Sequence, residues 1–302
     1  MPGTFATADI GSNTVHMLIA QTDGRAVVRL DNDSRWLGLG EMVANTGVID
    51  KAKTQELATA LSSFRKVATA RKATQLYVFA TEAVRRAKNH NETLTFIRSK
   101  SGVDVQIVSP EREAELAIRG AMLDSYGEMP TTFFDVGGGS AQVVRVHGST
   151  RTDFHSLPLG TGTLRANAQL EDRPNPDSIK RLDRIIEKTI APVEGHSPSK
   201  RLVGCGGVAR GLVRALHPDG DRSIHRYELD YLQTSLANLS STEVSRRFDI
   251  SPTRASSLLP GVAVISKLMD AVGIDKILVS EFGIREGAIL GLAEGSIEVG
   301  KG

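Results

Sequence analysis

The sequence has one cysteine, few aromatic residues and almost no net charge. With Cys205 alone, neither a disulfide framework nor a cysteine zinc site can form within the chain. A formal net charge of +2 gives no footprint of bulk nucleic-acid binding. A long apolar run and an N-terminal signal peptide are also missing. We therefore expect a cytoplasmic protein that binds neither a membrane nor a nucleic acid polymer and holds any anion locally.

The chain repeats itself at an offset of 126 residues, so that Ala8–Leu18 matches Phe134–Val144. Each copy is an apolar strand, then Asp-x-Gly with small polar residues, then a second strand. Aspartate matches aspartate, glycine matches glycine and a hydroxyl matches a hydroxyl. Each copy predicts a β-hairpin with a tight turn, and a chain of 302 residues has room for two domains built around them.

The turns have the composition of phosphate-binding loops. Glycine permits positive φ and lacks the Cβ that would keep a ligand from the backbone. Successive N–H groups can then point at a phosphate. The candidate phosphate-binding residues are Gly11, Ser12, Asn13 and Thr14 in the first turn, Gly137, Gly138, Gly139 and Ser140 in the second, and Gly206 and Gly207 after a third apolar strand.

Helices and strands alternate along the rest of the chain. Helices are predicted over 50–72, with Asp50 as N-cap, and over 92–101, 110–121, 176–190, 208–216, 228–239, 242–248 and 252–272. Strands are predicted over 76–80, 103–108 and 276–280. This pattern argues for two similar α/β domains facing across a cleft, residues 1–112 and 113–287, with a hinge near 109–113.

Phosphoryl transfer requires charge neutralisation, a phosphate cradle and an aligned nucleophile. Asp9 and Asp135 are hard oxygen ligands at strand ends and are candidate ligands for Mg²⁺ or Mn²⁺. Glu113 is the candidate that activates water, with Glu111 as its rival. From spacing alone, both glutamates also suit the positive end of a helix dipole, and one Asp-x-Gly turn alone would be an ordinary turn.

Several collinear segments resemble the exopolyphosphatase and guanosine pentaphosphate phosphohydrolase (Ppx/GppA) family of the actin-like, ribonuclease H-like superfamily. They span nearly the whole chain: Asp9–Thr14, Ala80–Arg85, Ser109–Ala114, Asp135–Ser140, Leu159–Gly162, Gly204–Gly207 and Arg285–Gly287.

The resemblance implies roles for individual residues. The glutamate directly before alanine is the family's proposed base, which selects Glu113 over Glu111. Asp135, Gly137 and Ser140 would bind metal and terminal phosphate, and Asn13 would belong to the opposing loop. Arg85 would contact substrate phosphate with its planar fork. The domains would be actin-like, with a C-terminal helix over 288–302 packed back on the first.

The function that this resemblance implies is an exopolyphosphatase, releasing terminal orthophosphate by metal-dependent attack of water. Longer members carry additional C-terminal domains that help form a basic passage for the polymer, so short-chain polyphosphate is the expected substrate here. The alternatives are a guanosine pentaphosphate 5′-phosphohydrolase or nucleoside triphosphatase, and a non-catalytic nucleotide-binding regulator. A homodimer is the expected assembly.

Overall fold

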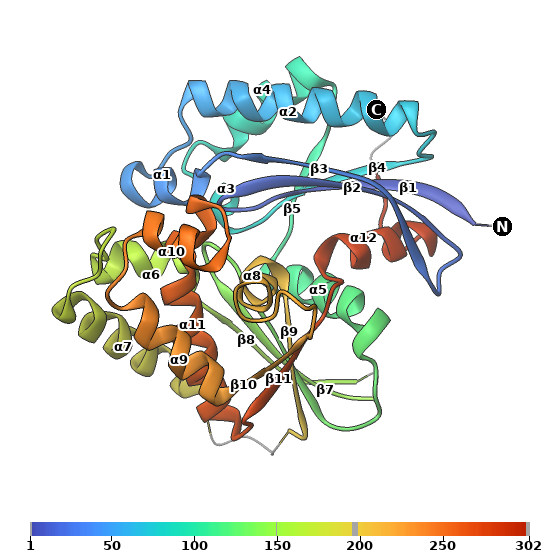
Figure 1. Cartoon of the computed structure of the whole chain (residues 1–302). Coiled ribbons are helices and arrows are strands. Elements are labelled where there is room, and N and C mark those ends of the chain that lie inside the picture. Colours follow the sequence, from blue (N-terminus) through green and yellow to red (C-terminus); the bar gives the residue numbers. More distant parts are fainter. Residues whose placement is uncertain (1, 149, 195–198, 300–302) are drawn as a thin grey trace. The chain divides into compact units, whose positions relative to one another are not determined.

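The computed structural model describes residues 2–148, 150–194 and 199–299 and divides the chain into two compact units (Figure 1). Unit 1 is Met1–Leu123 with Phe282–Gly302, and unit 2 is Asp124–Glu281. Residues 1 and 300–302 of unit 1 lie outside the described part. Each unit has a sheet and its own helices, which confirms the predicted pair of α/β domains.

The sheet of unit 1 has the strand order β3-β2-β1-β4-β5. A hairpin of β1 (Gly3–Ile10) and β2 (Thr14–Thr22) is extended by β3 (Val27–Trp36) at one edge. On the other side, β4 (Leu76–Ala80) and β5 (Val105–Ile107) run parallel to β1. The first predicted turn therefore lies where β1 ends, beside the end of β4.

Helices cover both faces of this sheet. On one face lie α2 (Lys51–Ala70) and α4 (His90–Ser101), and on the other α5 (Pro110–Ser125) and α12 (Ile284–Ala293). Alternation along β2 shows why: Met17 and Ile19 join the core under α2, whereas Leu18 packs with Ile289 of α12. Two short helices, α1 (Leu39–Thr46) and α3 (Glu82–Arg86), complete the unit. Asp50 caps α2 as predicted, accepting from Lys53 N.

The sheet of unit 2 has the order β10-β11-β9-β6-β7-β8. The second predicted hairpin is β6 (Thr131–Val136) with β7 (Ala141–His147), extended by β8 (Thr150–Leu157). Parallel to β6 lie β9 (Arg201–Cys205) and β11 (Lys276–Val279), and β10 (Ser223–His225) forms the far edge. The five strands β8-β7-β6-β9-β11 have the same order and the same relative directions as β3-β2-β1-β4-β5 of unit 1.

The helices of unit 2 surround one large core. They are α6 (Thr161–Ala168), α7 (Pro176–Ile190), α8 (Gly206–Leu216), α9 (Arg226–Leu236), α10 (Ser241–Phe248) and α11 (Pro252–Val272), with a 3₁₀ turn, η1 (Ala191–Val193).

The helix α11 differs from the expectation of no long apolar run. Arg254–Val272 has a mean hydropathy of 1.3 and is long and apolar enough to cross a membrane by length and composition. Of this stretch, 67% is buried inside the protein, where Val262, Ile265 and Leu268 have no exposed surface. A helix enclosed by other helices is apolar on every side, which explains the run.

The unit boundary differs from the predicted one. It falls after Leu123, at the end of α5, rather than between residues 112 and 113, because Leu116 of α5 packs with Phe79 of β4 and Ala288 of α12. The chain returns to unit 1 at Phe282, before the predicted residue 288. The C-terminal helix α12 packs on β1 and β2.

Candidate active site

The two predicted turns have the same backbone construction. Gly11 N donates to Thr14 O at 3.0 Å, and Gly137 N donates to Ser140 O at 2.9 Å. These bonds join equivalent residues of the repeat, so the sequence duplication is also a structural one. Each turn closes a hairpin at the end of a strand whose neighbour, β4 or β9, runs parallel to it.

In unit 1 the turn is tied to the segment that carries Arg85. The backbone N–H of Thr81, directly after β4, donates to Ile10 O at 3.1 Å, and the Thr81 hydroxyl donates to the same oxygen. Helix α3 starts at the next residue, and its buried Ala83 and Val84 fix the helix on the core. This brings Arg85 to the end of the sheet where the first turn lies.

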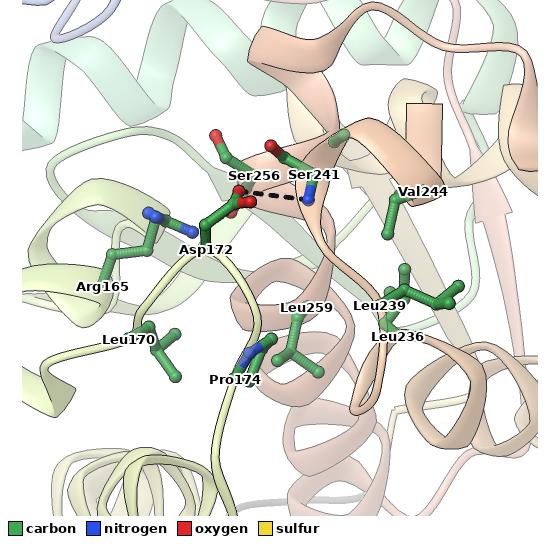
Figure 2. Close-up of a pocket in the computed structure, with 11 residues that line it drawn as sticks. Arg165, Leu170, Asp172, Pro174, Leu236, Leu239, Ser241, Val244, Ser256 and Leu259 are labelled. Carbon is green, nitrogen blue, oxygen red and sulfur yellow. Dashed lines mark hydrogen bonds between the residues drawn. The ribbon is translucent and has the colours of Figure 1, made fainter. Parts of the chain in front are cut away.

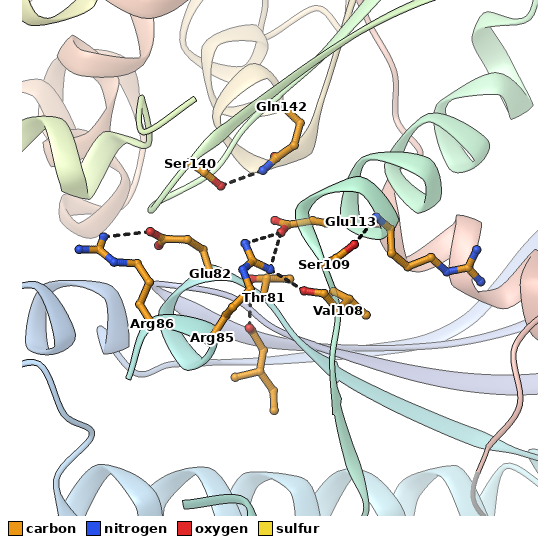
Figure 3. Close-up of polar contacts among 11 residues, drawn as sticks. Thr81, Glu82, Arg85, Arg86, Val108, Ser109, Glu113, Ser140 and Gln142 are labelled. Atoms are coloured by element: carbon orange, nitrogen blue, oxygen red, sulfur yellow. Dashed lines mark hydrogen bonds and ion pairs between the residues drawn. The ribbon is translucent and has the colours of Figure 1, made fainter. Parts of the chain in front are cut away.

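Arg85 and Glu113, distant in sequence, are brought together within unit 1 (Figure 3). The Arg85 guanidinium donates to Val108 O at 2.6 Å and lies 3.4 Å from Glu113 Oε2 through both terminal nitrogens. Glu113 sits in the first turn of α5, after Pro110. Their side chains are only 23% and 16% exposed. The separation of 3.4 Å exceeds the roughly 2.7–2.9 Å of a tight charged hydrogen bond.

In unit 2 the aspartate of the turn is partly buried against a glycine. A Cβ on Gly206 would lie 2.0 Å from Asp135 Oδ1, and Gly206 has φ of +83°, so this position favours glycine. Burial raises the pKa of Asp135, and the nearby charge of Arg210 offsets only part of that effect. The site holds a carboxylate whose charge is poorly solvated.

Asp135 fits a divalent cation. It is a hard oxygen donor at a strand end, and its desolvated charge favours a bound cation. Asp9 occupies the equivalent position in unit 1, partly buried at the end of β1 and opposite His16 in the register of the hairpin. Among the described residues, no group of three or more His, Cys, Asp and Glu side chains could enclose a metal. Magnesium that keeps several waters needs one or two carboxylates and substrate oxygens.

The remaining predicted residues lie in or beside the turns. Ser12 and Ser140 are buried, and the Ser140 hydroxyl accepts from Gln142 Nε2 at 2.8 Å (Figure 3). Gly207 is exposed in the first turn of α8. Cys205 is buried, its thiol donates to Phe134 O, and burial raises its pKa.

One group of basic residues was not identified as functional from the sequence. Burial and the neighbouring guanidiniums of Arg214 and Arg210 lower the pKa of Arg254. Arg210 and Arg214 lie one turn apart on α8, and Arg254 is in the first turn of α11, which packs on α8. Like charges that repel one another in a half-buried place are suited to an anion.

A small pocket of unit 2 lies elsewhere (Figure 2). Its lining includes the apolar side chains of Leu170, Leu236 and Leu259, and Asp172, also in the lining, accepts from Ser241 N at 3.1 Å. The described residues that line it include none of the predicted site residues.

The fold defines an actin-like protein in which each unit carries a turn of the same construction. The solved structure of the Aquifex aeolicus member of the Ppx/GppA family superposes with a TM-score of 0.85 and 26% identity, covering 99% of this chain and 100% of that one. An exopolyphosphatase structure from Cytophaga hutchinsonii shares the fold, with a TM-score of 0.89 at 21% identity and coverage of 99% and 100%.

The profile of the Ppx/GppA phosphatase family matches residues 18–295. The chain belongs to this family. Among curated relatives, Exopolyphosphatase 1 of Mycobacterium tuberculosis is 27% identical over 297 residues, which cover 93% of this chain and 86% of that protein. Exopolyphosphatase 1 of Mycobacterium leprae is 26% identical, with coverage of 93% and 87%.

Proposed function

We propose that this phosphatase is an exopolyphosphatase that releases orthophosphate from the end of short-chain polyphosphate, with Glu113 activating the attacking water. The family and the names of its mycobacterial relatives support this activity. The near-neutral net charge suits a short anion held at one place better than a long polyanion bound along the surface.

The pairing of Glu113 with Arg85 carries the proposal. A general base must be held near the reacting water and remain able to accept its proton. Arg85, itself fixed by Val108 O, orients Glu113 at 3.4 Å and has donors suited to phosphate oxygens. When substrate arrives, the guanidinium can hold phosphate while the carboxylate turns to the water.

The other residues bind and neutralise the phosphate. The turns at Gly11–Thr14 and Gly137–Ser140 supply backbone donors, and Asp9 and Asp135 would hold Mg²⁺ or Mn²⁺. When bound, such a cation supplies charge neutralisation to the terminal phosphoanhydride. Arg254 with Arg210 and Arg214 provides positive charge for further phosphates of the substrate.

The test is phosphate release by wild-type protein and Glu113→Gln from tripolyphosphate, long-chain polyphosphate and guanosine pentaphosphate, with magnesium or a chelator. We expect the highest kcat/KM for tripolyphosphate, no release with chelator, and a loss of roughly 10²–10⁴-fold in the variant. The ratio of kcat/KM values decides the substrate. A higher value for guanosine pentaphosphate would make the chain a nucleotide phosphohydrolase instead.

The matched control is Glu115→Gln on the same helix, which removes an exposed carboxylate paired with Arg112 at 2.8 Å. Its activity should stay within about twofold of wild type, because a surface pair contributes little. Glu111→Gln separates the two neighbouring candidates. Full activity in Glu113→Gln would rule out the proposed base, and no release from any of the three substrates would favour the regulator.

A further inference from the structure

A Leu-Gly-x-Gly segment forms backbone hydrogen bonds with each predicted phosphate-binding turn. In unit 1 the segment is Leu37–Gly40, between β3 and the first turn of α1, and in unit 2 it is Leu159–Gly162, between β8 and the first turn of α6. We call these the clamp segments. The pair belongs to the same duplication as the turns, although the repeat in the turns alone did not reveal it.

The clamp segments bond to equivalent carbonyl groups. Gly40 N donates to Ser12 O at 2.6 Å, and Gly162 N donates to Gly138 O at 2.8 Å. Ser12 and Gly138 are the same position of the repeat. Further bonds reach Asn13 O from Leu37 N and Gly38 N, and Gly137 O from Thr161 N.

These bonds determine where the N–H groups of the turns point. In a planar trans peptide the C=O and the following N–H point in opposite directions. A clamp bond to Ser12 O therefore directs the N–H of Asn13 away from the clamp, and a bond to Gly138 O does the same for Gly139. These are N–H groups of the predicted phosphate cradles.

Three glycines of the clamp segments have little or no room for a Cβ. A Cβ on Gly40 would lie 2.7 Å from Ser12 Cβ, and a Cβ on Gly160 would lie 2.2 to 2.4 Å from backbone atoms of Gly139 and Ser140. A Cβ on Gly162 would be 3.0 Å from Gly138 O. At Gly40 the nearest obstacle is the Ser12 side chain, with Ser12 O next at 3.3 Å, and in unit 2 the equivalent of Ser12 is already a glycine.

We propose that Gly40 and Gly162 are positioning residues that aim the backbone donors of the two turns at phosphate. The proposal builds on the proposed function, since it names the residues that set the cradles of the same site. A methyl group on Gly40 pushes Ser12 and turns the Asn13 N–H out of line. Removal of the Ser12 side chain relieves this contact while keeping the backbone donors.

The experiment is a double-mutant cycle of Gly40→Ala and Ser12→Gly. Calorimetry in the Glu113→Gln background, where hydrolysis during the titration is slow, measures the affinity for inorganic tripolyphosphate with magnesium. Phosphate release by the same variants with Glu113 intact gives kcat and KM. We expect Gly40→Ala to weaken binding about tenfold with Ser12 intact and less than about threefold in the Ser12→Gly background. Gly162→Ala, which meets only one carbonyl oxygen, should weaken binding roughly threefold.

Gly211→Ala is the control, because a Cβ there meets no atom within 4 Å. It should bind tripolyphosphate as tightly as wild type. Unchanged affinity in folded Gly40→Ala, or an equal loss in both backgrounds, would overturn the clamp and leave the hydrolase intact. The expected cycle in a protein that binds tripolyphosphate without hydrolysing it would keep the clamp and overturn the hydrolase. A wild-type protein that binds no tripolyphosphate would overturn both.

Discussion

The two turns are closed by the same backbone hydrogen bond. They differ in the segment that follows the neighbouring parallel strand. In unit 1, β4 ends at Ala80, and Thr81 leads into the short helix that carries Arg85. In unit 2, β9 ends at Cys205, and Gly206 begins α8 at once. The positive φ and missing Cβ of Gly206 let the helix begin directly against Asp135.

The parts that the two units share are structural, and the parts in which they differ carry the candidate reactive side chains. The duplicated hairpins and clamp segments provide similar backbone donors twice. The segments after β4 and β9 are not alike: unit 1 brings Arg85 to Glu113, whereas unit 2 buries a carboxylate near Arg210. We infer that the two turns and their aspartates bind phosphate and cation in similar ways, and that only unit 1 adds the pair that activates water.

Among the variants that test this comparison, Asp135→Asn should have the largest effect on activity. Losing the carboxylate should lower activity roughly 10²–10³-fold, a typical loss for one electrostatic group of an active site. The fold should be as stable or more stable, because burial penalises the charged form of Asp135. Phosphate release and thermal unfolding measure the two effects. If Asp135→Asn keeps full activity or loses stability, the role proposed for this carboxylate is wrong and the comparison fails.

Asp124→Asn probes unit 2 alone, at the place where the chain enters it. Asp124 accepts from the Ser280 hydroxyl at 2.6 Å and from Glu281 N at 3.0 Å, and pairs with Arg222. Its loss should destabilise unit 2 by about 2 kcal/mol, since charged hydrogen bonds contribute about 1.5–3 kcal/mol each and the amide replaces part of them. Hydrogen exchange should rise in β11 and stay unchanged in β1. Equal increases in both strands would show that the units do not unfold separately.

The stabilisation contributed by Asp124 should also depend on pH. Burial raises the pKa of Asp124, but hydrogen bonds from Ser280 and Glu281 outweigh it, so the pKa lies below its usual value. The stabilisation is therefore present above the ordinary pKa of aspartate and is lost as the pH falls through the lowered one. Urea titrations should show wild type and Asp124→Asn converging in acid. A constant difference down to the lowest pH would contradict this.

Arg85→Lys tests the arginine of unit 1. A lysine cannot hold Val108 O, Glu113 and a phosphate at once, because it has one charged nitrogen instead of a planar fork. We expect kcat/KM to fall about tenfold, with a larger part in KM. Arg86→Lys is the matched control, since Arg86 is an exposed partner of Glu82 on the same helix. Comparable losses in the two variants would mean that Arg85 has no special place.

Gly211→Ala has the smallest expected effect and distinguishes two kinds of glycine in α8. Gly206 is confined by Asp135, whereas Gly211 lies inside the helix with space around its Cα. Alanine at position 211 should stabilise unit 2 by about 0.5–1 kcal/mol through helix propensity. Urea unfolding measures this, and a loss of stability would show that Gly211 is also needed for close packing.

Much of the fold could be predicted because its pattern is local. The repeat predicted both hairpins, and the predicted bounds of β4 and α11 agree with the structure. The third strands β3 and β8, the edge strand β10 and the short helices α1, α3 and α6 were missed. β3 is an edge strand with polar and charged residues exposed along both faces, so its sequence has no alternation to detect.

Candidate site residues could be named from the sequence, but the contacts between them could not. Glycine turns and a helix-initial glutamate are visible in sequence, whereas the approach of Arg85 to Glu113 depends on how α3 and α5 pack. The proximity of Arg254 to Arg210 depends in the same way on α11 and α8. The boundary predicted from the sequence was misplaced, because the apolar stripe of α5 does not indicate which of the two sheets the helix packs on.

Unit 1 is formed by two separate stretches of the chain, and this affects the order in which the units fold during synthesis. Its first stretch leaves the ribosome early, but α12, which covers β1 and β2 with Ala288 and Ile289, emerges only after all of unit 2 has been synthesised. Unit 2 is one continuous stretch and can close its own core first. We expect nascent chains to acquire protease resistance in the later half before the earlier one, opposite to the usual order of synthesis.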